Sequence, residues 1–185
     1  DLKPENLFLT NEDDQYLRIG DFGLSRKIDT KKLTAYVVTR WYRSPEVLEN
    51  VLKNNKTYSY AIDIYSIALC IIEMMIGYPL LQGTSCIDQL FKIEKTLGKN
   101  DVVNEILNIN HDTDLNCNTN RSVVIYNLIT QRYKDELNNN KNIFYYLSDL
   151  LSRMLNYDPS NRPSALNALN HSFFCYGKML NYHDI

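Results

Sequence analysis

The clearest pattern in the chain is a long apolar segment in which hydrophobic residues recur at helical spacing. From Tyr60 onward this spacing predicts one strongly apolar helix, which Gly77 and Pro79 end. Asp63, Ser66 and Glu73 interrupt the apolar run, so we expect a helix buried in a protein core and not a membrane span. The apolar positions that carry the spacing are Ile62, Tyr65, Leu69, Ile72 and Ile76.

Three further segments show shorter amphipathic patterns. Residues 87–97 predict a second helix that Gly98 closes, and the sequence Pro163-Ser164-Ala165 starts a last helix that runs to about His171. Residues 100–142 are rich in asparagine and weakly patterned, and we expect an irregular insert with some helix and a mobile tract at 137–142. The remaining amphipathic helix is marked by Phe144, Leu147, Leu150, Leu151 and Leu155.

The beginning of the chain has a different character. Residues 7–9 and 16–19 are mostly apolar and flank the polar cluster 10–14, which predicts a short β-hairpin. Residues 23–38 show no sustained period, as expected for a loop that changes conformation. The predicted fold class is therefore mainly α, with a small β-hairpin at one end.

The composition indicates the number of domains, the kinds of partner and the state of the cysteines. The chain has 185 residues, which suits one well-buried domain, and a net charge of -2 gives no electrostatic reason to expect nucleic acid or a membrane as partner. The four cysteines are scattered without CxxC spacing, which favours reduced thiols in the cytoplasm or nucleus over a structural metal or disulfide. The three histidines suggest no metal cluster.

The candidate chemistry lies in three motifs, Asp1-Leu2-Lys3-Pro4-Glu5-Asn6, Asp21-Phe22-Gly23 and the stretch 39–46. A carboxylate at Asp1 could orient an attacking hydroxyl, Lys3 could neutralise a transferred phosphoryl group, and oxygens of Asn6 and Asp21 could bind Mg²⁺. Gly23 gives the backbone beside Asp21 freedom to move. Singly, each residue is typical of an ordinary polar turn; together and in this order they favour phosphoryl transfer.

The three motifs resemble those of the C-terminal lobe of eukaryotic protein kinases, and the resemblance covers nearly the whole chain. It implies the C-terminal lobe of a kinase domain over residues 1–175, a tail over 176–185, ATP and Mg²⁺ as cofactors, and proteins as substrates. Packing in the core is the alternative role for Phe8. The implied catalytic residues are Asp1, Lys3 and Thr39; the nucleotide contacts are Lys3, Glu5, Asn6, Phe8 and Asp21; the metal ligands are Asn6 and Asp21; the structural residues are Glu46, Asp63 and Arg162.

The stretch Thr39-Arg40-Trp41-Tyr42-Arg43 is similar to that of the proline-directed kinases, which include the cyclin-dependent and mitogen-activated kinases. The resemblance implies a strained backbone at Val38 that leaves the substrate residue after the acceptor without a partner for its N–H, so that proline is favoured there. It also implies that Thr39 contacts Asp1 and Lys3, which favours serine or threonine over tyrosine as acceptor.

Thr34-Ala35-Tyr36 stands where mitogen-activated kinases carry a dual phosphorylation site. The resemblance implies that arginines order the phosphorylated loop, Arg26 for Thr34 and the pair Arg40 and Arg43 for Tyr36. An unmodified loop is the alternative.

Some residues depart from the family pattern. The stretch 21–46 is short for a mitogen-activated kinase and closer to the male-germ-cell-associated kinases, the tail has Asp184 as its one acidic candidate for docking, and Ser44 stands where alanine is frequent. In the apolar helix, Tyr65, Ala68 and Leu69 replace Trp, Gly and Cys of the family.

In kinases the first motif usually includes His-Arg directly before this aspartate. The chain therefore begins within the motif. We therefore expect a C-terminal piece of a longer protein, which by itself would be inactive and poorly soluble because half of the nucleotide pocket belongs to the other lobe. The alternative function is a catalytically inactive, kinase-like lobe that binds other proteins.

Overall fold

The computed structural model describes residues 1–10, 16–25, 40–53, 59–98, 120–134 and 137–181. Within these residues none of the helices has the length and apolar character needed to cross a bilayer. The strands are β1 (Leu7–Thr10) and β2 (Tyr16–Ile19), and short 3-10 turns cover Pro4–Asn6, Phe22–Leu24 and Pro159–Asn161. The α-helices are α1 (Pro45–Lys53), α2 (Ala61–Ile76), α3 (Cys86–Leu97), α5 (Arg121–Arg132), α6 (Leu137–Met154), α7 (Ala165–Leu169) and α8 (Ser172–Asn181).

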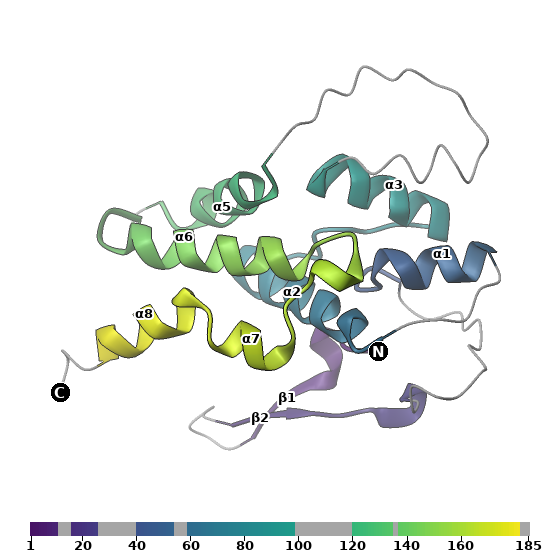
Figure 1. Cartoon of the computed structure of the whole chain (residues 1–185), viewed down its shortest axis with the longest axis horizontal. Helices are drawn as coiled ribbons and strands as arrows, with labels where there is room; N and C mark the ends of the chain where they lie inside the picture. Colours follow the sequence, from purple (N-terminus) through teal and green to yellow (C-terminus); the bar gives the residue numbers. More distant parts are fainter. Residues whose placement is uncertain (11–15, 26–39, 54–58, 99–119, 135–136, 182–185) are drawn as a thin grey trace.

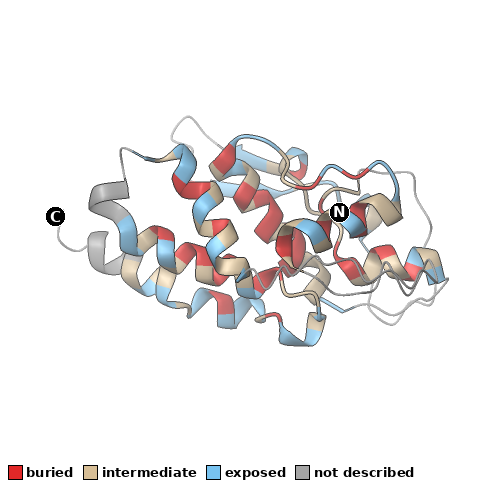
Figure 2. Ribbon diagram, turned by 90° about the horizontal axis from the view of Figure 1, so that it is seen from above, coloured by how far each residue is buried: buried red, intermediate tan, exposed pale blue. Residues whose placement is uncertain are grey.

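Helix α2 is the centre of the fold and confirms the prediction from apolar spacing. It ends at Gly77, whose φ of 88° is a left-handed conformation that glycine adopts without steric cost. Helices α5 and α6 pack against α2, α3 packs against α1 and α5, and α8 packs against α6. Figure 2 shows buried residues on the faces that these helices turn toward one another. Fully buried side chains from four helices meet in this core: Tyr65, Ile72, Leu90, Ile125, Ile129 and Leu151.

The β-hairpin projects from one edge of the helical body (Figure 1). Its strands are antiparallel, with Leu7 opposite Ile19 and Thr10 opposite Tyr16, which confirms the predicted hairpin. The four residues of β2 are all exposed, so the hairpin contributes little to the core.

Several helices differ from the sequence-based expectations. Helix α1 was not predicted, and α5 and the first turn of α6 lie inside the segment 100–142 that we expected to be irregular with some helix. The helix predicted from Phe144 begins at Leu137, so its first turn covers part of the Asn-rich tract. The last helix was expected to end near His171, but α7 ends at Leu169 and α8 follows it into the predicted tail.

Local hydrogen bonds explain the break between α7 and α8. The Asn170 N–H closes α7 by donating to the carbonyl of Leu166 at 3.2 Å. The ring of His171 then accepts the N–H of Phe173 at 3.2 Å and so caps the first turn of α8. His171 also contacts Asp149 of α6 at 2.9 Å, which fixes this corner to the core.

Candidate active site

The loop at residues 1–6 is tied together by the side chain of Asn6, which is 5% exposed. Pro4 starts a 3-10 turn in which the Asn6 N–H donates to the Lys3 carbonyl at 2.9 Å. The Asn6 side-chain amide donates to the carbonyl of Asp1 at 2.8 Å. Because the NH₂ group is engaged with the loop, the amide oxygen is the atom of Asn6 that can serve as a metal ligand.

Lys3 and Asp1 form an ion pair on this loop. Their charged atoms are 3.1 Å apart, and their side chains are 16% and 15% exposed. Partial burial lowers the screening of the pair by water, so each charge helps to fix the other in place. A carboxylate and an ammonium group are thus held side by side, as the sequence predicted.

The hairpin brings Asp21 to the same end of the molecule. The Gly20 N–H donates to the Asn6 carbonyl at 2.9 Å, so Asp21, the residue after Gly20, is held close to Asn6. Asp21 has φ 54° and ψ 70°, a left-handed conformation, and its carboxylate accepts the Gly23 N–H at 3.3 Å. A left-handed non-glycine residue costs free energy and is frequent at functional sites.

Phe8 follows this loop on β1 and is 51% exposed. A Cβ atom at Gly20 would lie 2.5 Å from a carbon of the Phe8 ring. The ring therefore lies against the glycine that precedes Asp21, and at 51% exposure it is not packed in the core, which was the alternative for Phe8. Glu5 is exposed.

Helix α2 carries residues that face both the loop and the segment 40–43. Burial raises the pKa of Asp63. Ser66 donates to the Tyr42 carbonyl at 2.8 Å, and the Tyr42 hydroxyl donates to Glu73 at 2.6 Å. Burial and then the bond to Glu73 raise the pKa of Tyr42, which keeps this hydroxyl a donor.

Sequence reasoning missed the roles of Ser66, Glu73 and Tyr42. The two helix residues were noticed as polar interruptions of an apolar run, but they were used to exclude a membrane span. The same polar interruptions could have revealed these roles, because a polar residue on a buried helix face needs a hydrogen-bond partner.

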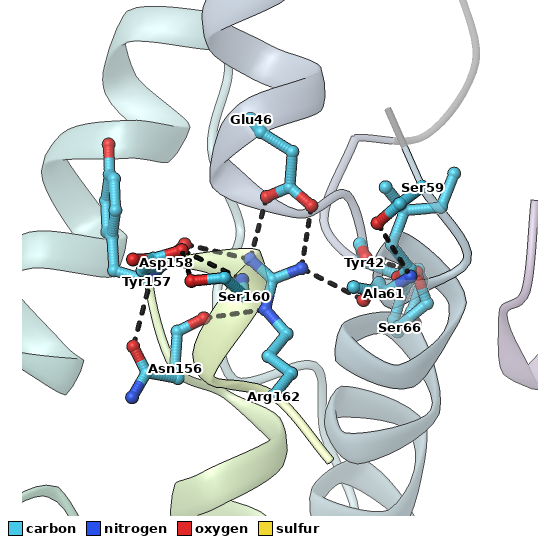
Figure 3. A network of polar contacts seen from close by, with 11 residues as sticks. Tyr42, Glu46, Ser59, Ala61, Ser66, Asn156, Tyr157, Asp158, Ser160 and Arg162 are labelled. Atoms are coloured by element: carbon cyan, nitrogen blue, oxygen red, sulfur yellow. Dashed lines mark hydrogen bonds and ion pairs between the residues drawn. The ribbon is translucent and has the colours of Figure 1, made fainter. Parts of the chain in front are cut away.

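The predicted pair Glu46 and Arg162 lies at the centre of a larger network of hydrogen bonds (Figure 3). Two nitrogens of Arg162 donate to the two carboxylate oxygens of Glu46, each at 2.7 Å. The remaining donors reach three backbone carbonyls, and the guanidinium lies 5.0 Å from the ring centre of Tyr65. Every N–H of Arg162 has a partner, and the network joins α1 to the start of α2 and to the loop before α7. The three carbonyls are those of Ala61, Asn156 and Tyr157.

The predicted regulatory arginines lie partly within the described residues. Arg40 donates to the Thr84 carbonyl at 2.9 Å. Burial lowers the pKa of Arg43, and the charge of Arg40 also lowers it. Residues 26–39, which hold the other regulatory candidates and Thr39, lie outside the described residues, and so does Asp184.

No group of three or more His, Cys, Asp or Glu side chains gathers as a metal site in the described part of the chain. The substituted residues Tyr65, Ala68 and Leu69 are all buried in α2. Ser44 is 1% exposed, and its hydroxyl has no partner among the described residues.

Comparisons with known proteins agree with this geometry. The protein kinase domain family matches residues 1–174. The chain is 36% identical over 180 residues to cyclin-dependent kinase F-3 of Oryza sativa subsp. japonica and 35% identical over 181 residues to the human serine/threonine-protein kinase MAK. These alignments cover 96% and 97% of the chain but 37% and 27% of the two relatives, so the chain spans about a third of their length.

A solved structure has the same fold. The structure of the CAK complex from Chaetomium thermophilum bound to ATP-gamma-S matches with a TM-score of 0.67 and 27% identity, covering 94% of the chain and 51% of that chain. The relatives confirm the predicted resemblance to the group that contains the cyclin-dependent and male-germ-cell-associated kinases. The chain belongs to the protein kinase domain family.

Proposed function

We propose that the protein transfers the γ-phosphate of ATP to serine and threonine residues of proteins, at sites followed by proline. The observation that carries this proposal is the convergence of Asp1, Lys3, Asn6 and Asp21 at one end of the hairpin, fixed by the Asn6–Asp1 and Gly20–Asn6 hydrogen bonds. A carboxylate, an ammonium group and two oxygen ligands are the groups that phosphoryl transfer requires of a protein.

Each residue has a distinct task. Asp1 accepts the proton of the substrate hydroxyl and aligns its oxygen for attack, and Lys3 stabilises the negative charge that develops on the phosphoryl oxygens. The amide oxygen of Asn6 and the carboxylate of Asp21 hold Mg²⁺, which neutralises the phosphates of ATP when bound. The adenine would lie near Phe8, whose ring is accessible at 51% exposure. Glu5 is a further residue of the nucleotide site.

The preference for proline rests on Val38, the residue before Thr39, and on the segment that follows. In that segment the carbonyls of Tyr42 and Trp41 are anchored to α2 and α3. We place the substrate residue after the acceptor against the backbone that runs from Val38 into this anchored segment, where proline has no N–H that would lose a hydrogen bond. We expect Thr39 to hydrogen-bond Asp1 and Lys3, which favours serine or threonine over tyrosine as the acceptor.

Activation by phosphorylation of Thr34 and Tyr36 is the second part of the proposal. Arg40 and Arg43 are three residues apart in the chain, and a phosphate on Tyr36 would accept hydrogen bonds from both guanidinium groups. Arg26 would bind the phosphate on Thr34. An upstream activating kinase is then a candidate partner.

We propose the cytoplasm or the nucleus as the compartment, on the state of the cysteines. Cys70, Cys86 and Cys175 are free thiols in the structure, which suits the reducing cytoplasm or nucleus. We assign the kinase to these compartments.

The catalytic test uses the full-length protein with a Ser-Pro peptide. Lys3→Met should lower kcat by roughly 10² to 10³, and Asp1→Asn by roughly 10² to 10⁴. Lys95→Met, which removes an exposed lysine of α3, is the matched control and should leave kcat unchanged. If Lys3→Met and Lys95→Met are equally active, the catalytic assignment is wrong, and the alternative of a protein-binding lobe is favoured.

Regulation and specificity need separate experiments. A peptide array in which alanine after the acceptor serves as well as proline would refute the proline preference.

Thr34→Ala combined with Tyr36→Phe should abolish the gain in activity that treatment with an activating kinase produces. Unchanged activation in that double variant would refute the switch but not the catalytic assignment.

A further inference from the structure

Gln89 is a polar side chain with 0% exposure on α3, and all of its hydrogen-bonding groups are used. Its amide oxygen accepts the Gly83 N–H at 2.7 Å. Its amide nitrogen donates to the carbonyls of Trp41 at 3.1 Å and Leu81 at 3.2 Å. A glutamine is costly to bury unless each of these atoms has a partner, so this position selects for the amide itself.

The loop that Gln89 holds also contacts the side chain of Trp41. The indole N–H of Trp41 donates to the Gly83 carbonyl at 3.3 Å. Gly83 has no room for a side chain, because a Cβ atom there would lie 2.6 Å from the Cα of Gln89. Trp41, Gly83 and Gln89 thus form a closed set of contacts in which each residue positions the other two.

The opposite side of the segment 40–43 is held by α2. Ser66 donates to the carbonyl of Tyr42, the residue after Trp41, and Glu73 accepts the Tyr42 hydroxyl. Successive carbonyls are therefore fixed by two different helices, Trp41 by α3 and Tyr42 by α2.

We infer that Gln89 is a positioning residue for the protein substrate. It acts through Trp41, because its amide holds the Trp41 carbonyl against α3. Trp41 in turn positions the backbone segment against which we place the substrate residue that follows the phosphoacceptor. This inference rests on the proposed function, in which the segment after Thr39 contacts the substrate. Gln89 touches neither nucleotide nor acceptor hydroxyl, so it should govern how tightly a peptide binds and not the chemical step.

The test compares Gln89→Met with Gln82→Met in the full-length kinase. Methionine keeps the size of the side chain and removes all three hydrogen bonds of Gln89. Gln82 is an exposed glutamine of the same loop whose amide donates to the Pro79 carbonyl, and it is the matched control. Gln89→Met should raise the KM for a Ser-Pro peptide about tenfold, with kcat and the KM for ATP within about twofold of wild type.

A purely structural role would give a different result. If Gln89→Met raises the KM for ATP as much as the KM for the peptide, or leaves the peptide KM equal to that of Gln82→Met, the inference is wrong. Trp41→Phe provides a second variant in case Gln89→Met folds poorly. It removes the indole donor to Gly83 and should raise the peptide KM about threefold to tenfold without changing the KM for ATP.

The peptide sequence separates this inference from the proposed function. If the wild-type kinase phosphorylates Ser-Ala and Ser-Pro peptides equally, the proline preference fails, but the selective rise in peptide KM still supports Gln89. If the wild-type kinase prefers proline and Gln89→Met keeps both the preference and the wild-type peptide KM, the proposed specificity stands and the inference fails.

Discussion

Arg162 donates to both carboxylate oxygens of Glu46 at 2.7 Å, across a separation of 116 residues in the sequence. The Arg162 side chain is 0% exposed and that of Glu46 is 17% exposed. The pair joins the start of α1 to the loop before α7, and it fixes the end of the segment that carries Arg40 to Arg43. Its role in the kinase is to hold that segment against the helical core.

Removal of Arg162 should therefore destabilise the fold strongly. Arg162→Gln leaves the Glu46 carboxylate and three backbone carbonyls without their partner, and we expect the free energy of unfolding to fall by about 3–5 kcal/mol. Arg153→Gln is the control, because Arg153 pairs with Asp149 at 3.0 Å but is 61% exposed. The control should cost less than about 1 kcal/mol. Urea unfolding measures both, and equal losses would contradict the architectural role.

Gly83 should tolerate no side chain. In Gly83→Ala the new Cβ would lie 2.4 Å from the amide oxygen of Gln89 and 2.6 Å from its Cα. The second of these contacts is with backbone, so α3 would have to move, at a cost of about 1–3 kcal/mol. Gln82→Ala, next to it on an exposed position, should change the free energy of unfolding by less than about 1 kcal/mol. A stable Gly83→Ala protein with wild-type peptide KM would show that this contact is loose.

Asp21 should depend on its side chain for its backbone conformation. Asparagine tolerates φ 54° better than alanine does and can still accept the Gly23 N–H. Asp21→Ala should therefore lower the free energy of unfolding by about 1 kcal/mol relative to Asp21→Asn. Both variants should lose activity, since neither supplies a carboxylate to Mg²⁺. Thermal unfolding without nucleotide separates the two effects, and equal stabilities would show that the left-handed backbone is not strained.

The elements that could be predicted from the sequence are those with a strong local signal. Helix α2 has sustained apolar spacing and a glycine stop, and the hairpin has two apolar runs around a polar cluster. The motif spacing also placed Asn6 and Asp21 at the two ends of that hairpin, which the Gly20–Asn6 hydrogen bond now explains.

The elements that were missed depend on distant partners. Helix α5 has a weak apolar pattern, but Arg121 at its start donates to the carbonyls of Leu97 and Ser152 at the ends of α3 and α6. Such a helix is fixed by tertiary contacts that a local pattern does not contain. Gln89 was missed for the same reason, because its partner Trp41 is 48 residues away.

The buried thiol of Cys70 should be inert in the folded kinase. Cys70 is 1% exposed, and burial, followed by the charges of Glu73 and Glu5, raises its pKa from 9.0 to about 12. Because the thiolate is the reactive form, this shift leaves roughly a thousandfold less of it at pH 8 than an ordinary thiol has. Iodoacetamide at pH 8 should therefore modify the exposed Cys175 and leave Cys70 intact, as read by peptide mass spectrometry. In guanidinium chloride the two should react at similar rates, which is the control, and rapid labelling of Cys70 in the native protein would show that α2 opens to solvent.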